Sequence, residues 1–242
     1  MKVALVTGGS RGIGRAISTK LAEDGYHVLI NYVSNHAEAQ KTLEMVSSAG
    51  GNGELMQCDV SNPEMVKRVL GAWHEANGEN YIEVLVNNAG ITRDNLMVFM
   101  SEDEWEEVIK TNQYSFFFVT RYLLQNMVVN KRGRIVNIVS LSGQRGLAGQ
   151  VNYAASKGAV MAATKSLAME VGKKNVTVNA VAPGFIRTEM IRNLDEKQLS
   201  ALIPLRRFGE PAEVAEVVSF LVSDRASYIT GEIISVNGGM HS

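Results

Sequence analysis

Cysteine is nearly absent from this 242-residue sequence: Cys58 stands alone, so no disulfide can form within the chain. The four histidines are scattered and suggest no metal-ligand cluster, so we expect no metal site. No apolar run approaches the ~18 residues needed to cross a bilayer. The segment Met1–Thr7 is too short in apolar residues for a signal h-region and is typical of a strand. These absences predict a protein of the reducing cytoplasm with no membrane segment.

Charge of one sign is also lacking. Lys and Arg number 24 and Asp and Glu 25, which gives a net charge of -1. Such a chain has no overall field to attract nucleic acid or a membrane surface. With 45% hydrophobic residues and no repeat or Pro/Gly-rich linker, it can bury one continuous core. We expect a single domain over residues 1–242.

Short apolar runs rich in β-branched residues predict strands, and segments with an apolar residue at every third or fourth position predict helices. The strand candidates are 3–6, 28–30, 84–86, 135–139, 176–181 and 232–236, with a weaker one at 53–57. The helix candidates are 13–21, 37–46, 65–73, 105–127 and 153–171. This alternation predicts the α/β class, with a Rossmann-type doubly wound parallel sheet covered by helices on both faces.

The longest loop-like stretch, residues 184–208, is the candidate substrate lid. Five of its apolar side chains suit an acyl chain, although packing in the core would explain them equally. They are Met190, Ile191, Leu194, Leu199 and Leu202.

A glycine-rich turn follows the first predicted strand and leads into an amphipathic helix. After Thr7 it reads Gly8, Gly9, Ser10, Arg11, Gly12, Ile13 and Gly14. Glycine at these spacings allows a tight turn and lets the backbone approach a pyrophosphate, which the helix N-terminus then favours. A purely structural turn also uses glycine, but this one has the strand–turn–helix context that a dinucleotide site requires.

The end of the second strand, Asn31–Asn35, lacks the Asp or Glu that an NAD site places against the ribose 2′-hydroxyl. Without that carboxylate, Arg11 can hold a 2′-phosphate, which favours NADPH. The alternative is that Arg11 is a solvated loop charge. After the third strand, Asp59 with Val60 could meet the adenine, or Asp59 could only cap the next turn.

Tyr153 and Lys157 stand four residues apart on a predicted helix and therefore project from the same face. An ammonium beside a phenol stabilises the phenolate, so we expect Lys157 to lower the pKa of Tyr153. Tyr153 could then protonate the oxygen of a ketone that receives hydride from a nicotinamide. A half-buried ring beside a snorkelling amine is the structural alternative.

Two further polar residues favour the catalytic interpretation. Ser140 directly follows a predicted strand, where open α/β sheets bind ligands, although Ser142 is a rival. Asn112 is a poor helix former inside a long predicted helix and indicates a kink that would expose its backbone carbonyl. The alternative is an Asn tolerated on a solvated face.

Together these motifs resemble the short-chain dehydrogenase/reductase family over essentially the whole chain. The motifs are Thr7-Gly8-x-x-x-Gly12-x-Gly14, Asn87-Asn88-Ala89-Gly90, Asn112, Ser140, Tyr153-x-x-x-Lys157 and Pro183-Gly184. The resemblance implies a seven-stranded sheet in the order 3-2-1-4-5-6-7. It also implies a catalytic tetrad of Asn112, Ser140, Tyr153 and Lys157, because the thirteen-residue gap between serine and tyrosine selects Ser140.

The same resemblance assigns cofactor contacts. It places Asn88, Ala89 and Gly90 on the adenosine ribose side and lets Tyr153 and Lys157 reach the nicotinamide ribose. It brings the nicotinamide half against Pro183, Gly184, Ile186 and Thr188. Val33 stands where many such reductases carry Arg or Thr, which leaves Arg11 and Ser34 for the 2′-phosphate.

Within the family, the runs 87–96, 182–186 and 228–240 are similar to 3-oxoacyl-[acyl-carrier-protein] reductases. This similarity implies NADPH-dependent reduction of a 3-oxoacyl thioester in fatty acid synthesis, with an acyl carrier protein docking near Lys131 and Lys174. Cations at helix C-termini are also ordinary complements of the macrodipole. The family further implies a homotetramer, consistent with the extra apolar residues Phe116, Phe117, Phe118, Met161 and Met169.

Two other functions remain open. One is a related reductase or dehydrogenase for another ketone or secondary alcohol, such as acetoacetyl-CoA, a polyketide or a sugar. The other is a dinucleotide-binding sensor without catalysis, which predicts damage to the tetrad that is not seen in the sequence.

Overall fold

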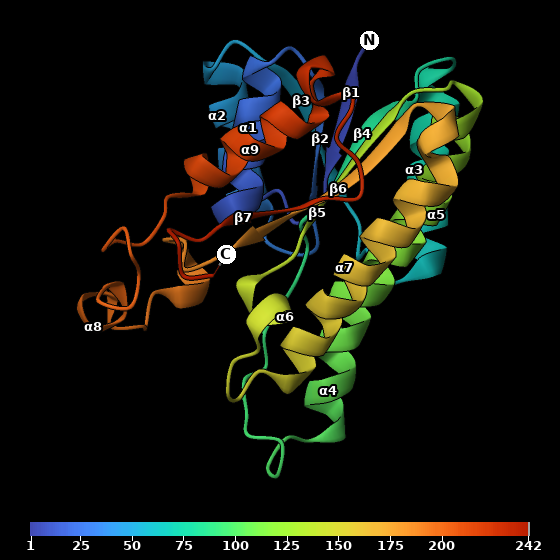
Figure 1. The fold of residues 1–242 in the computed structure, drawn as a ribbon. Helices are drawn as coiled ribbons and strands as arrows, with labels where there is room; N and C mark the ends of the chain where they lie inside the picture. The colour runs from blue at the N-terminus through green and yellow to red at the C-terminus, as the bar shows by residue number, and fades with distance from the viewer. Residues whose placement is uncertain (242) are drawn as a thin grey trace.

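Seven strands form one parallel sheet across residues 1–241, the part of the chain described by a computed structural model (Figure 1). The strand order is β3-β2-β1-β4-β5-β6-β7, which confirms the predicted doubly wound sheet. The strands are β1 (Val3–Val6), β2 (His27–Tyr32), β3 (Asn52–Gln57), β4 (Ile82–Asn87), β5 (Gly133–Ile138), β6 (Val176–Pro183) and β7 (Ile233–Val236).

Helices cover both faces of this sheet, as predicted. In Figure 1, α1 (Gly12–Glu23), α2 (His36–Ser48) and α9 (Pro211–Val222) lie on one face. On the other face lie α3 (Pro63–Asn77), α5 (Ser115–Val129) and α7 (Val151–Val171), while α4 (Glu102–Ile109) lies beyond the carboxyl ends of the strands beside the start of α7. The short helices α6 (Leu141–Arg145) and α8 (Glu196–Ser200) lie near the carboxyl ends of the strands.

The central strands are buried along their whole length because helices pack on both faces. This explains why Val, Ile and Leu are frequent in them, and why polar residues within them, such as Asn137 and Asn179, are buried and hydrogen-bonded. One core cluster lies against α1 and α9, and a second lies against α3 and α5. The sheet therefore holds the loops at its carboxyl edge on a rigid base.

The helix predicted over 105–127 is interrupted in the structure. A π-helical segment, η1 (Lys110–Tyr114), separates α4 from α5. The structure also has α9 and α6, which the sequence analysis did not predict. In α9 the dense apolar run Val217–Val222 gives a helix and a strand nearly the same pattern, and only Pro211 at the first turn indicates a helix.

Within residues 1–241, no helix is long and apolar enough to cross a bilayer. The same part of the chain brings together no group of three His, Cys, Asp or Glu residues that could hold a metal ion. Cys58 is buried, and this burial raises the pKa of its thiol to about 11, so the thiol stays protonated at neutral pH.

Candidate active site

Four turns that the sequence analysis singled out meet at the carboxyl edge of the sheet. They follow β1, β4, β5 and β6, which are neighbours in the sheet. The glycine turn follows β1, the Asn88–Gly90 segment follows β4, Ser140 follows β5 and Gly184 follows β6. Parallel strands bring these loops together regardless of their distance in the sequence, as expected for a ligand crevice in an open α/β sheet.

The glycine turn requires glycine at several of its positions. Gly8 and Gly12 have φ angles of +61° and +54°, in the left-handed region that side chains rarely adopt. A Cβ on Gly14 would lie 2.2 Å from the carbonyl oxygen of Gly8. The helix α1 therefore starts directly against the turn, with Arg11 at its N-cap and no side-chain cap bond. This backbone cradle with uncapped N–H groups fits the pyrophosphate of a dinucleotide.

Asn31 holds the glycine turn in place, a role that the sequence analysis missed. Its side chain is 1% exposed, accepts a hydrogen bond from the Gly8 N–H (3.1 Å) and donates to the carbonyls of Met56 (3.2 Å) and Cys58 (2.9 Å). The amide is suited to this position because it supplies an acceptor on one side and donors on the other. The only sequence signal was an Asn inside an apolar strand, which indicates a satisfied buried amide.

The Asn88–Gly90 segment is tied to the glycine turn. The Thr7 hydroxyl accepts hydrogen bonds from the N–H groups of Asn88 (2.9 Å) and Ala89 (3.0 Å). The Asn88 side chain donates to the carbonyls of Thr7 (2.9 Å) and Gly8 (3.1 Å). These bonds fix the start of the crevice between β1 and β4, where the sequence analysis expected the adenosine ribose.

The residues predicted to contact the adenine and the 2′-phosphate differ in their burial and in their hydrogen-bond partners. Asp59 accepts hydrogen bonds from the N–H (2.9 Å) and the hydroxyl (2.7 Å) of Ser61, as the turn-capping alternative expects, while Val60 is buried. Ser34 is exposed. Arg11 is exposed and pairs with Glu189 at 3.1 Å, which is also compatible with the alternative of a solvated loop charge. Its contact with a 2′-phosphate stays a prediction.

Tyr153 and Lys157 lie in the first two turns of α7, and the Tyr153 phenol forms a hydrogen bond with Ser140 after β5. The Lys157 Nζ is buried, donates to the Ile138 carbonyl at 2.8 Å and lies 5.7 Å from the centroid of the Tyr153 ring. A Cβ on Gly90 would lie 3.3 Å from this Nζ and 3.2 Å from the Asn112 Oδ1. Lys157 and Asn112 therefore converge on the end of β4, which excludes a snorkelling amine.

The expected decrease in the pKa of Tyr153 is wrong for this structure. Burial raises the pKa of Tyr153 to about 12, and Asp94 adds to the rise, although a hydrogen bond with Ser140 opposes it. The Lys157 ammonium bonds the Ile138 carbonyl and lies 5.7 Å from the centroid of the ring, so its attraction for a phenolate does not outweigh the burial. Tyr153 is thus a protonated phenol at neutral pH, the form that can donate a proton.

Ser140 and Ser142 differ in their partners. Ser140 caps α6 by accepting a bond from the Ser142 N–H (3.1 Å), and its hydroxyl also meets the Tyr153 phenol. The Ser142 hydroxyl instead bonds the Gln150 side chain (2.8 Å), which in turn bonds Asp94 (2.8 Å). This arrangement favours Ser140 over Ser142 as the partner of Tyr153.

Asn112 lies in the π-helical segment η1, so the irregularity predicted at this residue is present. It is 3% exposed, which contradicts the alternative of a solvated Asn. Its side chain bonds both the N–H (2.8 Å) and the carbonyl (3.0 Å) of Ile91 and donates to the Ser156 hydroxyl (3.1 Å). Asn112 thereby joins the end of β4 to α7.

Asn152 and Ser156 form hydrogen bonds with the backbone of Tyr153. The sequence analysis assigned neither residue a role. Asn152 is fully buried, accepts from the Tyr153 N–H (2.7 Å) and donates to the carbonyls of Arg93 (2.9 Å) and Glu104 (3.2 Å). The Ser156 hydroxyl donates to the Tyr153 carbonyl (2.7 Å). Two buried polar residues next to an expected catalytic residue were the signal that could have revealed them.

The segment after β6 forms the other wall of the crevice. Pro183 and Ile186 are buried, and a Cβ on Gly184 would lie 2.9 Å from Asn237. A Cβ on Gly12 would lie 3.3 Å from the Thr188 Cγ2, so Thr188 lies beside the glycine turn. The segment expected to contact the nicotinamide half thus runs from the buried end of β6, at Pro183, to Thr188 beside the glycine turn.

Comparison with known proteins agrees with this geometry. The family model described as enoyl-(acyl carrier protein) reductase matches residues 8–241. The chain is 47% identical to the 3-oxoacyl-[acyl-carrier-protein] reductase FabG of Vibrio cholerae over 99% of this chain and 97% of the relative. It is 44% identical to the enzyme of that name from Staphylococcus aureus, over 99% and 98%. A crystal structure from Agrobacterium tumefaciens, assigned as a gluconate dehydrogenase, superimposes with a TM-score of 0.94 at 32% identity, covering 99% of this chain and 95% of that one.

Proposed function

The chain belongs to the short-chain dehydrogenase/reductase family, and on that premise we propose that it reduces a 3-oxoacyl thioester to the 3-hydroxyacyl thioester with NADPH, in fatty acid synthesis. The observation that carries the proposal is the convergence of Tyr153, Ser140 and Lys157 at the same sheet edge as the glycine turn. Relatives of matching length bear the name of this activity.

A ketone suits the site better than a carbon–carbon double bond, the substrate that the family description implies. Tyr153 and Ser140 present two hydroxyl groups to one point, which matches a carbonyl oxygen that becomes an alkoxide. In a 3-oxo group the negative charge develops on the oxygen of the same carbon that takes the hydride, so both hydroxyls would serve that one atom, whereas in a 2-enoyl thioester it develops on the more distant thioester oxygen. The two hydroxyls therefore favour reduction of the 3-oxo group.

In the proposed mechanism, each polar residue has a separate role. Ser140 donates a hydrogen bond to the ketone oxygen and holds it beside the Tyr153 phenol. When bound, the nicotinamide supplies hydride to the ketone carbon. Tyr153 gives its proton to the oxygen as negative charge develops there. Lys157 stabilises the phenolate that remains. The hydrogen bonds of Asn112 hold α7 next to the segment that follows β4.

The dinucleotide would lie on the glycine turn, along Asn88–Gly90 and against the segment from Pro183 to Thr188. Its 2′-phosphate would meet Arg11 and Ser34. The end of β2 carries no carboxylate that would repel this group, which supports NADPH over NADH. Asp59 and Val60 would lie at the adenine, and Tyr153 and Lys157 would reach the nicotinamide ribose.

A panel of 3-oxoacyl thioesters tests the activity directly. We expect oxidation of NADPH, faster than of NADH, with 3-oxoacyl groups on an acyl carrier protein and on coenzyme A. The matching 2-enoyl thioesters should give little oxidation, because hydride addition to their double bond places the negative charge on the more distant thioester oxygen and not at C3. The measurement is the decrease in absorbance at ~340 nm. If no 3-oxoacyl thioester is reduced, the proposed substrate class is wrong.

The second candidate is a dehydrogenase for another secondary alcohol, which the match to the Agrobacterium protein favours. The proposed lid, residues 184–208, separates the two. Met190, Leu194 and Leu202 are 57%, 44% and 67% exposed there, so core packing does not account for them. Exposed apolar side chains suit an acyl chain better than a sugar, which supports the thioester.

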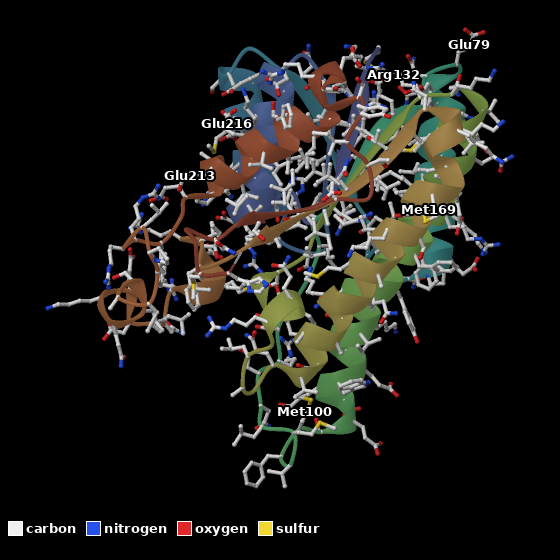
Figure 2. The ribbon with its side chains drawn as sticks, in the orientation of Figure 1. Glu79, Met100, Arg132, Met169, Glu213 and Glu216 are labelled. Carbon is white, nitrogen blue, oxygen red and sulfur yellow. The ribbon has the colours of Figure 1, made fainter. Side chains whose placement is uncertain are left out.

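Lys131 and Lys174, the proposed carrier-docking residues, are brought together by the fold. The Asn175 side chain, next to Lys174, donates to the Lys131 carbonyl at 3.1 Å. They lie at the far end of the 21-residue helix α7 from Tyr153, about 30 Å away at 1.5 Å per residue. In Figure 2, Arg132, beside Lys131, and Met100, just before the start of α4, lie at opposite ends of the molecule.

Charge reversal tests this docking. We expect Lys131→Glu with Lys174→Glu to raise KM roughly threefold to tenfold for a carrier-bound thioester and to leave KM for the coenzyme A thioester unchanged. An acidic carrier loses its attraction, whereas coenzyme A does not use the patch. Lys67→Glu, a reversal on α3, is the control. Equal effects on both substrates would argue against docking.

Self-association and location complete the proposal. Phe117 and Met169 are 51% and 87% exposed, which supports packing between subunits of a homotetramer, whereas Met161 is buried within the chain. The buried, protonated Cys58 is compatible with the reducing cytoplasm, where we place the reaction.

A further inference from the structure

The ion pair between Arg11 and Glu189 joins two parts of the site that the proposed reaction uses separately. Arg11 belongs to the glycine turn, and Glu189 begins η3 (Glu189–Ile191) in the proposed lid. The Arg11 Nη1 lies 3.1 Å from the Glu189 Oε2, and both side chains are exposed. The group expected to hold the 2′-phosphate is therefore held by a carboxylate of the lid.

The base of the lid supports this pairing because it is fixed over the turn. Ile186 and Gly209 form an isolated parallel bridge, and the N–H of Arg187 donates to the Gly209 carbonyl at 2.9 Å. Thr188 then contacts Gly12, as the 3.3 Å distance from a Cβ on Gly12 shows. Glu189 thus starts from an anchored backbone one residue past this contact.

Other cations beside the turn have partners within the cofactor half itself. Arg15 and Lys41 both bond the carboxylate of Glu38, and Arg15 also donates to the Ser10 carbonyl at 2.7 Å. None of these bonds involves a residue of the lid. Arg11 differs from both, since its carboxylate partner comes from the far side of the crevice.

We propose that Glu189 is a specificity-determining residue for the cofactor, whose carboxylate competes with the 2′-phosphate of NADPH for Arg11. NADPH must displace Glu189 to bind Arg11, whereas NADH has no group that needs Arg11. Glu189 therefore weakens NADPH selectively and ties the base of the lid to the glycine turn until the phosphate arrives. This inference rests on the proposed use of NADPH.

The energetics make the exchange feasible. An exposed ion pair is worth little, up to about a fivefold change in an equilibrium constant. The present pair uses one guanidinium nitrogen, whereas a phosphate can accept two parallel N–H bonds from Arg. If the pair is closed most of the time, the apparent Kd for NADPH rises by the inverse of the open fraction.

A double-mutant cycle on cofactor binding tests the proposal. The Kd values for NADPH and NADH are measured by nucleotide fluorescence, without ketone, for the wild type, Glu189→Gln, Arg11→Met and the double variant. We expect Glu189→Gln to lower the Kd for NADPH roughly twofold to fivefold and to leave that for NADH unchanged. The gain should vanish in the Arg11→Met background and shrink at high salt.

The control is Glu196→Gln, which removes a lid carboxylate that pairs with Arg187. It should leave the ratio of the two Kd values unchanged. The proposal is overturned if Glu189→Gln leaves the NADPH Kd unchanged or raises it, tightens NADH equally, or keeps its effect without Arg11. Because the titrations contain no ketone, failure of the thioester panel would refute the proposed substrate and leave this result standing. If Arg11→Met does not weaken NADPH, the proposed 2′-phosphate site fails first.

Discussion

Replacing Tyr153 by Phe is expected to lower kcat for a 3-oxoacyl thioester by about a thousandfold or more, with the Kd for NADPH within about twofold of wild type. The substitution removes only the phenol oxygen, and a positioned general acid contributes about 10²–10⁴-fold to such a reaction. The ring keeps its place because Asn152 and Ser156 bond the backbone of Tyr153. The measurements are steady-state turnover and a fluorescence titration with NADPH.

Two serines provide the matched pair for this experiment. Ser140→Ala should also lower kcat, because it removes the second hydroxyl at the ketone oxygen and the partner of Tyr153. Ser142→Ala should stay close to wild type, since that hydroxyl bonds Gln150. Unchanged turnover in Tyr153→Phe would reject the proton-donor role. Loss of both turnover and NADPH binding would show that the tyrosine is structural.

The pKa of Tyr153 bears on this prediction because it sets the protonation state of the phenol. Burial raises it to about 12, so the phenol stays protonated across the neutral range and is ready to reduce a ketone. Oxidation of the alcohol would need the phenolate as a base. Burial therefore favours the proton-donor form of Tyr153 at neutral pH, whereas the reactants and not the enzyme set the equilibrium of the reaction.

The sheet could be predicted from sequence because its strands are buried on both faces. The run Val84–Val86 is wholly apolar, and in the run Val176–Val181 the polar residues Thr177 and Asn179 are buried as well. The break between α4 and α5 could not be placed by periodicity, because a π-helical segment shifts the pattern by about one residue and both halves still look helical. The only warning was the poor helix former Asn112.

The candidate site could be predicted as a set of side chains but not as a network. Motif spacing identified Tyr153 and Lys157, whose helical geometry fixes their shared face. It could not reveal that Asn31 holds the glycine turn or that Glu189 reaches Arg11, because these contacts join residues 23 and 178 positions apart. Such pairs depend on how the strands and loops pack.

The pKa of Tyr153 was predicted in the wrong direction for a related reason. The sequence places an ammonium four residues away, which favours the phenolate, but it gives neither the depth of burial nor the orientation of the ammonium. In the structure Lys157 is directed to the Ile138 carbonyl, and desolvation of the phenol dominates. Charge neighbours can be read from a pattern, whereas solvent exposure depends on the whole fold.

Lys157 should cost the protein stability while serving its chemistry. Burial lowers the pKa of Lys157 from 10.5 to about 8, with desolvation as the cause. A difference of this size corresponds to a penalty of about 3 kcal/mol at neutral pH. Lys157→Met would relieve it and lose the bond to the Ile138 carbonyl, worth about 1 kcal/mol. We expect a net gain of about 2 kcal/mol, or roughly 4–8 °C in Tm.

The activity of Lys157→Met should change in the opposite direction. Without the ammonium, the phenolate left after proton transfer has no opposite charge beside it, so kcat should fall at least about a hundredfold. Turnover and thermal unfolding of the cofactor-free protein measure the two effects. A decrease in both stability and turnover would indicate that Lys157 mainly supports the fold.

The pH dependence distinguishes a stability gain of Lys157→Met that comes from removing a buried charge from a gain that comes from better packing. Because the folded pKa of Lys157 lies below its unfolded value, the unfolded chain binds more protons between about pH 8 and 10.5, and the free energy of unfolding rises with pH in that window. The penalty is complete below pH 8 and is lost towards pH 10.5. The advantage of Lys157→Met should therefore shrink by about 2 kcal/mol between pH 7 and 9.5, as measured by denaturant unfolding of both proteins. Subtracting the two curves cancels the opposite slope from Cys58, whose pKa is raised in both. A stability difference that stays constant over this range would assign the gain to packing and leave the charge of Lys157 without a measurable cost.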